Sequence, residues 1–303
     1  MGFRPFDADL SDQVALVTGA NSGMGKETAR ELVRMGSSVV LGCRSRERGE
    51  AAAAEIRETT ERGSVHVIQI DLASLASVRA FASEFSERFP KLDVLVNNAA
   101  ASLRVREVTP DGFEAHWATN VLGPHLLTTL LLPALERSGD GRIVTVSTVA
   151  AGGLDLSDTQ YERRRFTGVA AYRASKQASR MLTWALADRL KGTRVTANAL
   201  NPGYVLTDLT LSAGGPVKLL VRLTRFAAQS PLDGADTAIW LAASPAVQGA
   251  TGKFWNKRRK ARCRFRDPSA VQEVASLVER QLAEISRPTR RPESPGGRSG
   301  TRS

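Results

Sequence analysis

A phenol and an ammonium group stand four residues apart at Tyr172 and Lys176, in a segment with the periodicity of a helix. Residues at positions i and i+4 share one face of a helix, so the two side chains are expected to be neighbours. A phenol normally titrates at roughly 10, and a nearby positive charge favours the phenolate. Such a pair could move a proton at an alcohol or carbonyl oxygen. A tyrosine and a lysine at this spacing also occur on ordinary helix surfaces. Whether the pair is catalytic therefore depends on which residues surround it.

A hydroxyl group for the same chemistry is offered by Ser147, which ends a predicted strand over 142–147. The helix that carries Tyr172 follows this strand along the chain. In a parallel sheet a strand and the next helix are neighbours, so Ser147 and Tyr172 should meet at the carboxyl edge. There the hydroxyl could donate a hydrogen bond to a substrate oxygen.

A glycine-rich loop, Thr-Gly-Ala-Asn-Ser-Gly-Met-Gly over 18–25, lies between the first predicted strand and the first predicted helix. Glycine lets the backbone approach a ligand closely, and a helix N-terminus attracts a pyrophosphate. The loop therefore predicts a dinucleotide site, although a purely structural turn has the same composition. The expected contacts are Gly19, Asn21, Ser22, Gly23, Met24 and Gly25.

The choice of dinucleotide depends on the end of the second predicted strand. Where NAD sites carry an acid for the ribose 2′-OH, this chain has Arg44, which can pair with a 2′-phosphate. This favours NADP(H) over NAD(H), unless Arg44 and Arg46 only begin a solvated helix. Asp71, followed by Leu72, is placed to contact the adenine and to accept from its amino group. A helix or turn cap is the alternative for Asp71.

Apolar runs rich in β-branched residues alternate with helical patterns along the chain. The predicted strands cover 14–18, 38–43, 65–70, 94–96, 142–147, 195–200 and 252–256, and the predicted helices cover 25–36, 47–62, 75–89, 112–137, 170–190 and 268–285. We therefore predict an α/β fold with a single Rossmann-type, doubly wound parallel sheet, helices on both faces, and one domain over 1–285. Residues 286–303 hold three prolines, five arginines and no large apolar residue, which predicts a disordered basic tail.

Two segments interrupt this alternation. Residues 151–169 separate a strand from its helix, and 204–229 form an apolar stretch after Asn201-Pro202-Gly203. In a doubly wound sheet such excursions lie over the carboxyl ends of the strands, where ligands bind. We expect them to form the substrate side of the site, and the apolar composition of 204–229 favours a hydrophobic substrate.

The composition excludes several classes of protein. The chain has 303 residues, 42% of them hydrophobic and 24% charged, which is typical of a globular protein. Two cysteines, Cys43 and Cys263, are too few for a disulfide scaffold, and the three histidines have no metal-ligand spacing, so no metal site is predicted. No secretory segment precedes the fold, and the apolar run over 121–135 is too polar and short to span a bilayer. We therefore expect a cytoplasmic protein.

The formal net charge of +11 is concentrated near the C-terminus. From Lys253 onward there are 14 Lys and Arg against 5 Asp and Glu, whereas 1–252 hold 28 against 26. A basic surface over the whole protein and specific nucleic-acid binding are therefore not expected. The basic run over 257–266 is either a solvated edge or a contact for an acidic partner, nucleic acid or an anionic membrane surface.

Taken together, the motifs resemble the short-chain dehydrogenase/reductase family. They are Thr-Gly-x-x-x-Gly-x-Gly over 18–25, Asn97-Asn98-Ala99, Asn120, Ser147, Tyr172-x-x-x-Lys176 and Asn201-Pro202-Gly203, in the family's order over about 11–256. The chain is most similar to the retinol-dehydrogenase-like and protochlorophyllide-reductase-like branch, through Gly-Ala-Asn-Ser-Gly-Met-Gly-Lys-Glu-Thr-Ala, Gly-Cys-Arg after the second strand, and the long spacing from Ser147 to Tyr172. That branch mostly uses NADP(H). Its membrane members carry an N-terminal anchor of a kind that this sequence does not show, and Ala100 stands where the family usually has glycine.

The resemblance implies a role for each matching residue. Tyr172 would be the general acid/base, Lys176 would lower its pKa and hold the nicotinamide ribose, and Ser147 would orient the substrate oxygen. Asn120 would brace the long helix and a water that relays protons to Lys176. The cofactor would also contact Asn97, Asn98, Ala99, Pro202, Gly203, Val205 and Thr207. Family members commonly pair through their long helices, here 112–137 and 170–190, so a homo-oligomer is expected.

These observations favour an NADP(H)-dependent enzyme that interconverts an alcohol and a carbonyl on a small, hydrophobic substrate. Two alternatives remain open. One is a non-catalytic NADP(H)-binding sensor or scaffold that uses its basic C-terminus, although a pure sensor has no need of Asn120, Ser147, Tyr172 and Lys176 together. The other is an NADPH-dependent reductase of carbon–carbon double bonds, which would need the same cofactor site.

Overall fold

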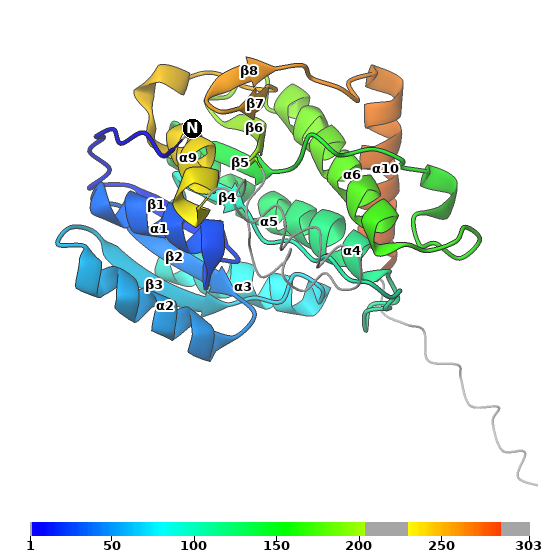
Figure 1. Ribbon diagram of the computed structural model, residues 1–303, viewed down its shortest axis with the longest axis horizontal. Helices are drawn as coiled ribbons and strands as arrows, with labels where there is room; N and C mark the ends of the chain where they lie inside the picture. Colours follow the sequence, from blue (N-terminus) through cyan, green and yellow to red (C-terminus); the bar gives the residue numbers. More distant parts are fainter. Residues whose placement is uncertain (1, 204–229, 286–303) are drawn as a thin grey trace, which may run out of the picture.

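A computed structural model describes residues 2–203 and 230–285 of the chain. Eight strands form one sheet in the order β3-β2-β1-β4-β5-β6-β7-β8 (Figure 1). The pairings from β3 through β7 are all parallel, and only β8 runs antiparallel to its neighbour β7. The order reverses between β1 and β4, which creates a crevice at the carboxyl edge.

The strands and helices have the following bounds. The strands are β1 Val14–Thr18, β2 Ser38–Cys43, β3 Ser64–Gln69, β4 Val94–Asn97, β5 Arg142–Val146, β6 Thr196–Asn201, β7 Phe254–Asn256 and β8 Arg259–Ala261. The α-helices are α1 Gly23–Arg34, α2 Arg46–Thr59, α3 Leu75–Arg88, α4 Ala115–Trp117, α5 Gly123–Arg137, α6 Gly168–Arg189, α9 Pro231–Ala243 and α10 Pro268–Ile285. A π-helical turn, Ala118–Leu122, joins α4 to α5, and short 3₁₀ turns cover Leu156–Asp158 and Pro245–Val247.

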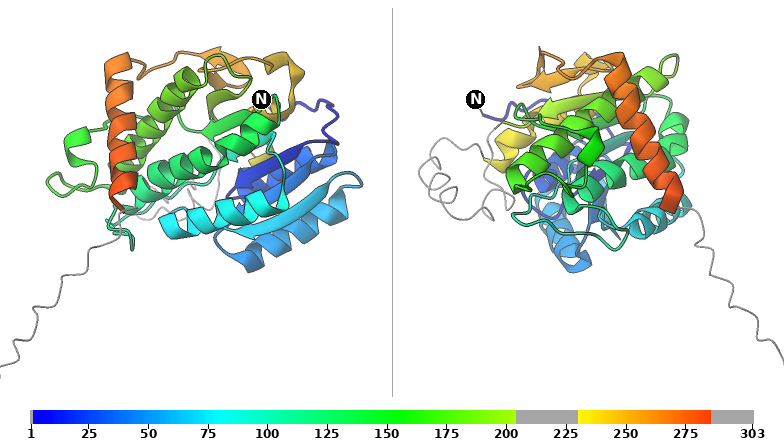
Figure 2. Two further views of the ribbon diagram at one scale, coloured as in Figure 1. Left: turned by 180° about the vertical axis from the view of Figure 1, so that it is seen from behind. Right: turned by 90° about the vertical axis from the view of Figure 1, so that its right-hand side faces the viewer.

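Helices cover both faces of the sheet, as the views in Figure 2 show. One hydrophobic core lies between the sheet and α3, α5, α6 and α10, and the other lies between the sheet and α1, α2 and α9. Each core contains the side chains of one face of the sheet, because side chains alternate between the two faces along a strand. The near-continuous apolar strands therefore follow from burial on both faces, and the predicted fold class is confirmed.

The run over 121–135 was expected to be too polar and short to span a bilayer, but the helical stretch Ala115–Arg137 that contains it is long and apolar enough by length and composition. Within the fold, however, 67% of its most apolar window is buried against other elements. Burial of this kind is typical of a core helix, and it accounts for the run of leucines in α5.

Three features of the fold differ from the sequence-based prediction. The long helix predicted over 112–137 begins only at Ala115 and contains the π-helical turn at Asn120. Helix α9, Pro231–Ala243, was not among the predicted helices. The sheet was predicted to be wholly parallel and to end at 256, but the basic run that follows forms β8. Its hairpin turn places Lys257 and Arg258 at φ of 53° and 60°, a conformation that sequence usually signals with glycine or asparagine.

Candidate active site

The glycine-rich loop leaves β1 at Thr18 and enters α1 at Gly23. Gly19 and Gly23 have φ of +66° and +56°, the left-handed region that favours glycine. At Gly25 a Cβ atom would overlap the carbonyl oxygen of Gly19, so this glycine allows the helix to pack closely on the loop. The three glycines are therefore required by two different constraints, and together they leave the start of α1 open.

Asn98, directly after β4, braces this loop. Its side-chain Nδ2 donates a 2.8 Å hydrogen bond to the carbonyl oxygen of Thr18, and its backbone N–H donates to Thr18 Oγ1 at 3.0 Å. The N–H of Ala99 donates to the same hydroxyl at 3.1 Å. The Asn97-Asn98-Ala99 segment thus fixes the shape of the phosphate loop from the neighbouring strand, a role that its spacing in the sequence does not reveal.

A cavity of about 650 Å³ opens between the loop and the carboxyl ends of β2, β3 and β4. Most of the residues predicted to contact a dinucleotide line it, namely Gly19, Asn21, Ser22, Gly23, Met24, Gly25, Arg44, Asp71, Leu72, Asn98 and Ala99. A cavity of this size, with a helix N-terminus and several polar groups, is of the kind that binds a cofactor. Ala100 also lines it, so the methyl group that replaces the family's glycine faces the same space.

Two arginines lie at the mouth of this cavity. Arg44 follows β2, Arg48 lies in the first turn of α2, and both side chains are exposed. Arg46, between them in sequence, does not line the cavity. Arg44 was predicted from the sequence, but Arg48 was not. Arg48 could have been found from Ser45, a typical N-cap residue, because a helix that begins after Ser45 carries Arg48 in its first turn.

Asp71 caps a turn and also lines the cavity, so it fits both of the roles considered for it. Its Oδ1 accepts a 2.9 Å hydrogen bond from the N–H of Ala73, which is a turn cap, and the residue still lines the cavity. A carboxylate that caps one N–H retains further lone pairs for a ligand donor.

Ser147 and Lys176 meet at the carboxyl end of β5. Lys176 Nζ donates a 2.8 Å hydrogen bond to the carbonyl oxygen of Val146, and Ser147 Oγ donates to the carbonyl oxygen of Lys176 at 3.2 Å. Both side chains are buried, at 3% and 2% exposure. The predicted juxtaposition of strand and helix is therefore present, with the lysine anchored to the residue next to the serine.

Burial shifts the titration of the phenol and the ammonium group in opposite senses. It raises the pKa of Tyr172 to about 12 and lowers the pKa of Lys176 to about 8. The ammonium nitrogen lies 5.8 Å from the centre of the Tyr172 ring. The expected lowering of the Tyr172 pKa by Lys176 is thus not found in this structure, because desolvation of the phenolate dominates.

Asn120 links helix α6 to the loop after β4. Its Oδ1 accepts from the N–H of Ala101 at 2.7 Å, and its Nδ2 donates to the Ala101 carbonyl at 3.0 Å and to Ser175 Oγ at 2.9 Å. Ser175 lies between Tyr172 and Lys176, and its hydroxyl donates to the Tyr172 carbonyl at 2.8 Å. The π-helical turn brings the asparagine into this position, so the long helix is braced at the residue predicted to do so.

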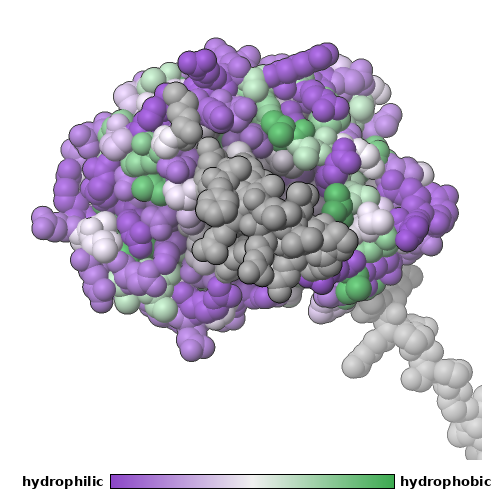
Figure 3. All heavy atoms as spheres, viewed as in Figure 1, coloured by the Kyte–Doolittle hydropathy of each residue, from purple (hydrophilic) through white to green (hydrophobic). Residues whose placement is uncertain are grey.

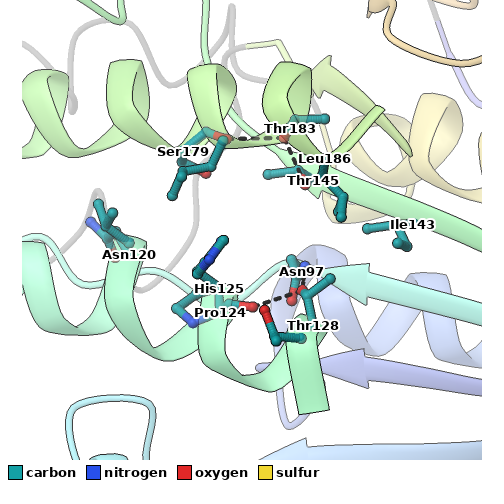
Figure 4. A pocket seen from close by; sticks show the side chains of 13 residues that line it. Asn97, Asn120, Pro124, His125, Thr128, Ile143, Thr145, Ser179, Thr183 and Leu186 are labelled. Atoms are coloured by element: carbon teal, nitrogen blue, oxygen red, sulfur yellow. Dashed lines mark hydrogen bonds between the residues drawn. The ribbon is translucent and has the colours of Figure 1, made fainter. Parts of the chain in front are cut away.

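Asn97 differs from the prediction. It was expected at the cofactor ribose, but it faces a small cavity of about 40 Å³ between α5 and α6 (Figure 4). Its Nδ2 donates to Thr128 Oγ1 at 3.0 Å, while its buried Oδ1 accepts no hydrogen bond from the residues that the structure describes. Neighbouring residues of a strand point to opposite faces, so Asn97 and Asn98 cannot both face the nucleotide cavity. His125, drawn in the same view, is half-buried there, and the resulting loss of solvation lowers its pKa to about 4.

The remaining predicted contacts lie beyond β6. Gly203 has φ of +87°, and Pro202 borders a small cleft with Asp233, Asp236 and Thr237 at the start of α9. Val205 and Thr207, like the whole segment 204–229 and the tail 286–303, lie outside the described residues. Within the part that the structure describes, no group of three or more His, Cys, Asp and Glu could hold a metal ion.

The chain is similar to several known proteins. The family model described as short chain dehydrogenase matches residues 13–214. Human Retinol dehydrogenase 14 is 39% identical over 295 residues, which cover 91% of this chain and 86% of that protein. Human Retinol dehydrogenase 12 is 40% identical over 252 residues, 82% of this chain and 79% of that protein.

Solved structures show the same fold. A putative uncharacterized protein from Mycobacterium paratuberculosis has a TM-score of 0.75 at 31% identity, over 93% of this chain and 98% of that one. A putative NAD(P) dependent gluconate 5-dehydrogenase from Beutenbergia cavernae, with bound NADP, has a TM-score of 0.66 at 32% identity, over 82% of this chain and 96% of that one. The chain therefore belongs to the short-chain dehydrogenase family, in its retinol-dehydrogenase-like branch, and is an oxidoreductase of alcohols and carbonyls that binds NAD(P) and a small-molecule substrate.

Proposed function

We propose that the protein is an NADP(H)-dependent carbonyl reductase or alcohol dehydrogenase, with Tyr172 as its acid/base and an apolar substrate. The observation that carries the proposal is the contact between Ser147, directly after β5, and Lys176 on α6, which Asn120 connects through Ser175 to Ala101 in the wall of the 650 Å³ cavity. The glycine loop, the open N-terminus of α1 and Asp71 fit a dinucleotide. When bound, the nicotinamide would supply or accept the hydride.

The protein's own groups would handle the proton. Ser147 Oγ, whose proton is donated to the Lys176 carbonyl oxygen in this structure, would turn that proton toward the substrate oxygen and so hold the oxygen for the Tyr172 phenol. A phenol with a pKa of about 12 is protonated at neutral pH, which suits donation of a proton to the oxygen of a carbonyl that is being reduced. Lys176, with a pKa of about 8, would stabilise negative charge on the phenolate that forms.

Arg44 and Arg48 support the choice of NADP(H). Both line the cavity at the end of β2, where a ribose 2′-phosphate would lie if the pyrophosphate sits at α1. Two guanidinium groups can bind a phosphate through charge-assisted hydrogen bonds. The bound NADP of the Beutenbergia cavernae structure is a parallel case in the same fold.

Exposed valines support an apolar substrate. Val149 lies two residues after Ser147 and is 55% exposed, and Val169 lies three residues before Tyr172 and is 64% exposed. Isolated exposed valines need no explanation, but these two flank the catalytic residues on two separate elements. They would give the approach to the site an apolar border.

Product analysis with a panel of carbonyl compounds tests the proposal. Purified protein with NADPH should reduce aliphatic or aromatic aldehydes and ketones to alcohols, and should act on polar hydroxy acids more slowly. Reduction of a carbon–carbon double bond in an α,β-unsaturated ketone, with the carbonyl left intact, would contradict the proposed reaction. Nucleotide binding without turnover of any compound would favour a sensor or scaffold.

A further inference from the structure

The hairpin β7–β8 carries a cluster of positive charge at the end of the sheet. Its exposed cations, called here the basic edge, are Lys257, Arg259, Lys260, Arg262 and Arg264. None of the five forms an ion pair with a carboxylate among the described residues. Arg258 differs, because it pairs with the buried Asp236 and stacks its guanidinium on Phe6 at 5.0 Å. Figure 3 shows hydrophilic residues along the upper rim of the molecule, where Figure 1 places β8.

A chain of hydrogen bonds connects the basic edge to the exposed Val149. The N–H of Val149 donates to Asn201 Oδ1 at 3.1 Å, and Asn201 Nδ2 donates to Asn256 Oδ1 at 3.1 Å. Asn256 directly precedes Lys257 in the hairpin turn. The valine and the turn therefore share the carboxyl edge of the sheet and are held in a fixed relation.

Helix α6 adds a second pair of the same composition. Val169 and Arg173 are four residues apart, so they share one face at the start of the helix, and both are exposed. The Arg173 Nε donates to the carbonyl oxygen of Ala150 at 2.7 Å, which brings this pair next to Val149. The two valines, Arg173 and the turn at Lys257 therefore lie at the carboxyl edge of the sheet, and the rest of the basic edge runs from that turn along β8.

We propose that this edge docks the protein on an anionic membrane surface. Unpaired cations are attracted to anionic headgroups, and exposed valines between them can enter the boundary between headgroups and acyl chains. A nucleic acid would use the cations but would gain little from the valines. Ser147 lies two residues before Val149, and Tyr172 lies directly before Arg173. A docked molecule would therefore turn its catalytic edge toward the bilayer. Docking itself depends on neither the cofactor nor the reaction.

Vesicle flotation with the full chain tests the proposal. The probes are vesicles of phosphatidylcholine alone and vesicles with about 30% phosphatidylserine. Arg259→Gln/Lys260→Gln/Arg262→Gln removes three charges from the basic edge. Arg189→Gln/Lys191→Gln/Arg194→Gln removes three exposed charges from the opposite edge, where α6 ends and β6 begins, and is the matched control. Val149→Ser tests the apolar part.

The protein should bind the phosphatidylserine vesicles and not the neutral ones. The triple variant of the basic edge should bind roughly 100-fold more weakly, since each Lys or Arg near a membrane contributes about 1 kcal/mol. The control triple should bind normally, and Val149→Ser should bind less well. Equal losses in both triples would overturn the proposal, because only net charge would matter. Binding to duplex or single-stranded nucleic acid but not to vesicles would overturn it too. Binding to neither vesicles nor nucleic acid would also overturn the proposal. The charges would then serve only to keep the edge strand β8 from pairing with other chains.

Discussion

The ammonium nitrogen of Lys176 donates a 2.8 Å hydrogen bond to the carbonyl oxygen of Val146, the residue that precedes Ser147. This contact ties helix α6 to the end of β5 through a buried charge. A buried ammonium with one neutral partner is costly, and the lowered pKa of Lys176 expresses that cost. The folded state therefore carries an electrostatic penalty at the end of β5 for as long as Lys176 is protonated.

The penalty predicts a pH dependence of stability. The pKa of Lys176 is about 8 in the folded chain against 10.5 for an ordinary lysine, so below pH 8 the folded state carries the buried charge. As pH rises from 8 to 10, the folded lysine loses its proton before the unfolded one. The free energy of unfolding of the wild type should then rise relative to Lys176→Met by about 2 kcal/mol.

Denaturant unfolding at intervals across this pH range measures the difference. Lys191→Met, at an exposed position after the same helix, is the control and should show no such change. Parallel pH profiles for the wild type and Lys176→Met would contradict the prediction.

Tyr172→Phe should reduce turnover by roughly 10²- to 10⁴-fold, because the variant has no proton to donate to the substrate oxygen. The dissociation constant of the nucleotide should stay within about twofold. Steady-state kinetics and nucleotide fluorescence measure the two quantities. Tyr161→Phe is the matched control, since Tyr161 is a buried tyrosine of the same domain, and its ring contact with Arg164 does not need the hydroxyl. Retained turnover in Tyr172→Phe would show that another group supplies the proton.

Gly25→Ala should weaken nucleotide binding by at least tenfold and lower stability by roughly 1–3 kcal/mol. The added methyl would overlap the Gly19 carbonyl oxygen, so the loop has to move. Gly139→Ala is a useful comparison, because Gly139 has φ of +77° but no atom within 4 Å of an added Cβ. That variant should lose stability through backbone strain alone and bind nucleotide normally. Equal affinities in the two variants would show that the close approach at Gly25 does not shape the site.

Asp236→Asn should destabilise the fold by roughly 3 kcal/mol, since it leaves the half-buried Arg258 guanidinium without its counter-charge. The same carboxylate accepts the N–H of Arg4 at 3.0 Å, so the N-terminal segment should detach from α9 as well. Thermal unfolding gives the first effect, and limited proteolysis near residue 4 gives the second. Glu27→Gln, which removes the partner of Arg30 within one helix, should cost less than about 1 kcal/mol. An Asp236→Asn variant as stable as the wild type would show that solvent compensates Arg258.

The sequence predicted those features that depend on periodicity and topology. Ser147, Tyr172 and Lys176 converge because a strand and its following helix are neighbours, whatever the details of packing. The glycine loop and Arg44 line one cavity because they follow β1 and β2, which are parallel neighbours and end at the same edge of the sheet.

Features that depend on side-chain direction or on tertiary context were missed. Whether Asn97 or Asn98 faces the nucleotide cavity depends on the pleat of β4. The short strand Val94–Asn97 is buried on both faces, so its sequence has no alternation that would fix the pleat. The π-helical turn at Asn120 is set by contacts with Ala101 and Ser175, far away in sequence. Strand β8 forms from charged residues because it pairs with β7 at an exposed edge, where burial imposes no apolar pattern.

Titration with NADPH and NADH tests the central claim most directly. The wild type should bind NADPH more tightly than NADH, and Arg44→Asp/Arg48→Asp should weaken NADPH binding at least 100-fold while NADH binding changes little. Arg46→Asp, which places the same change at an exposed neighbour outside the cavity, should behave like the wild type. Equal affinity for the two nucleotides in the wild type, or equal loss in Arg46→Asp, would contradict a 2′-phosphate site at Arg44 and Arg48.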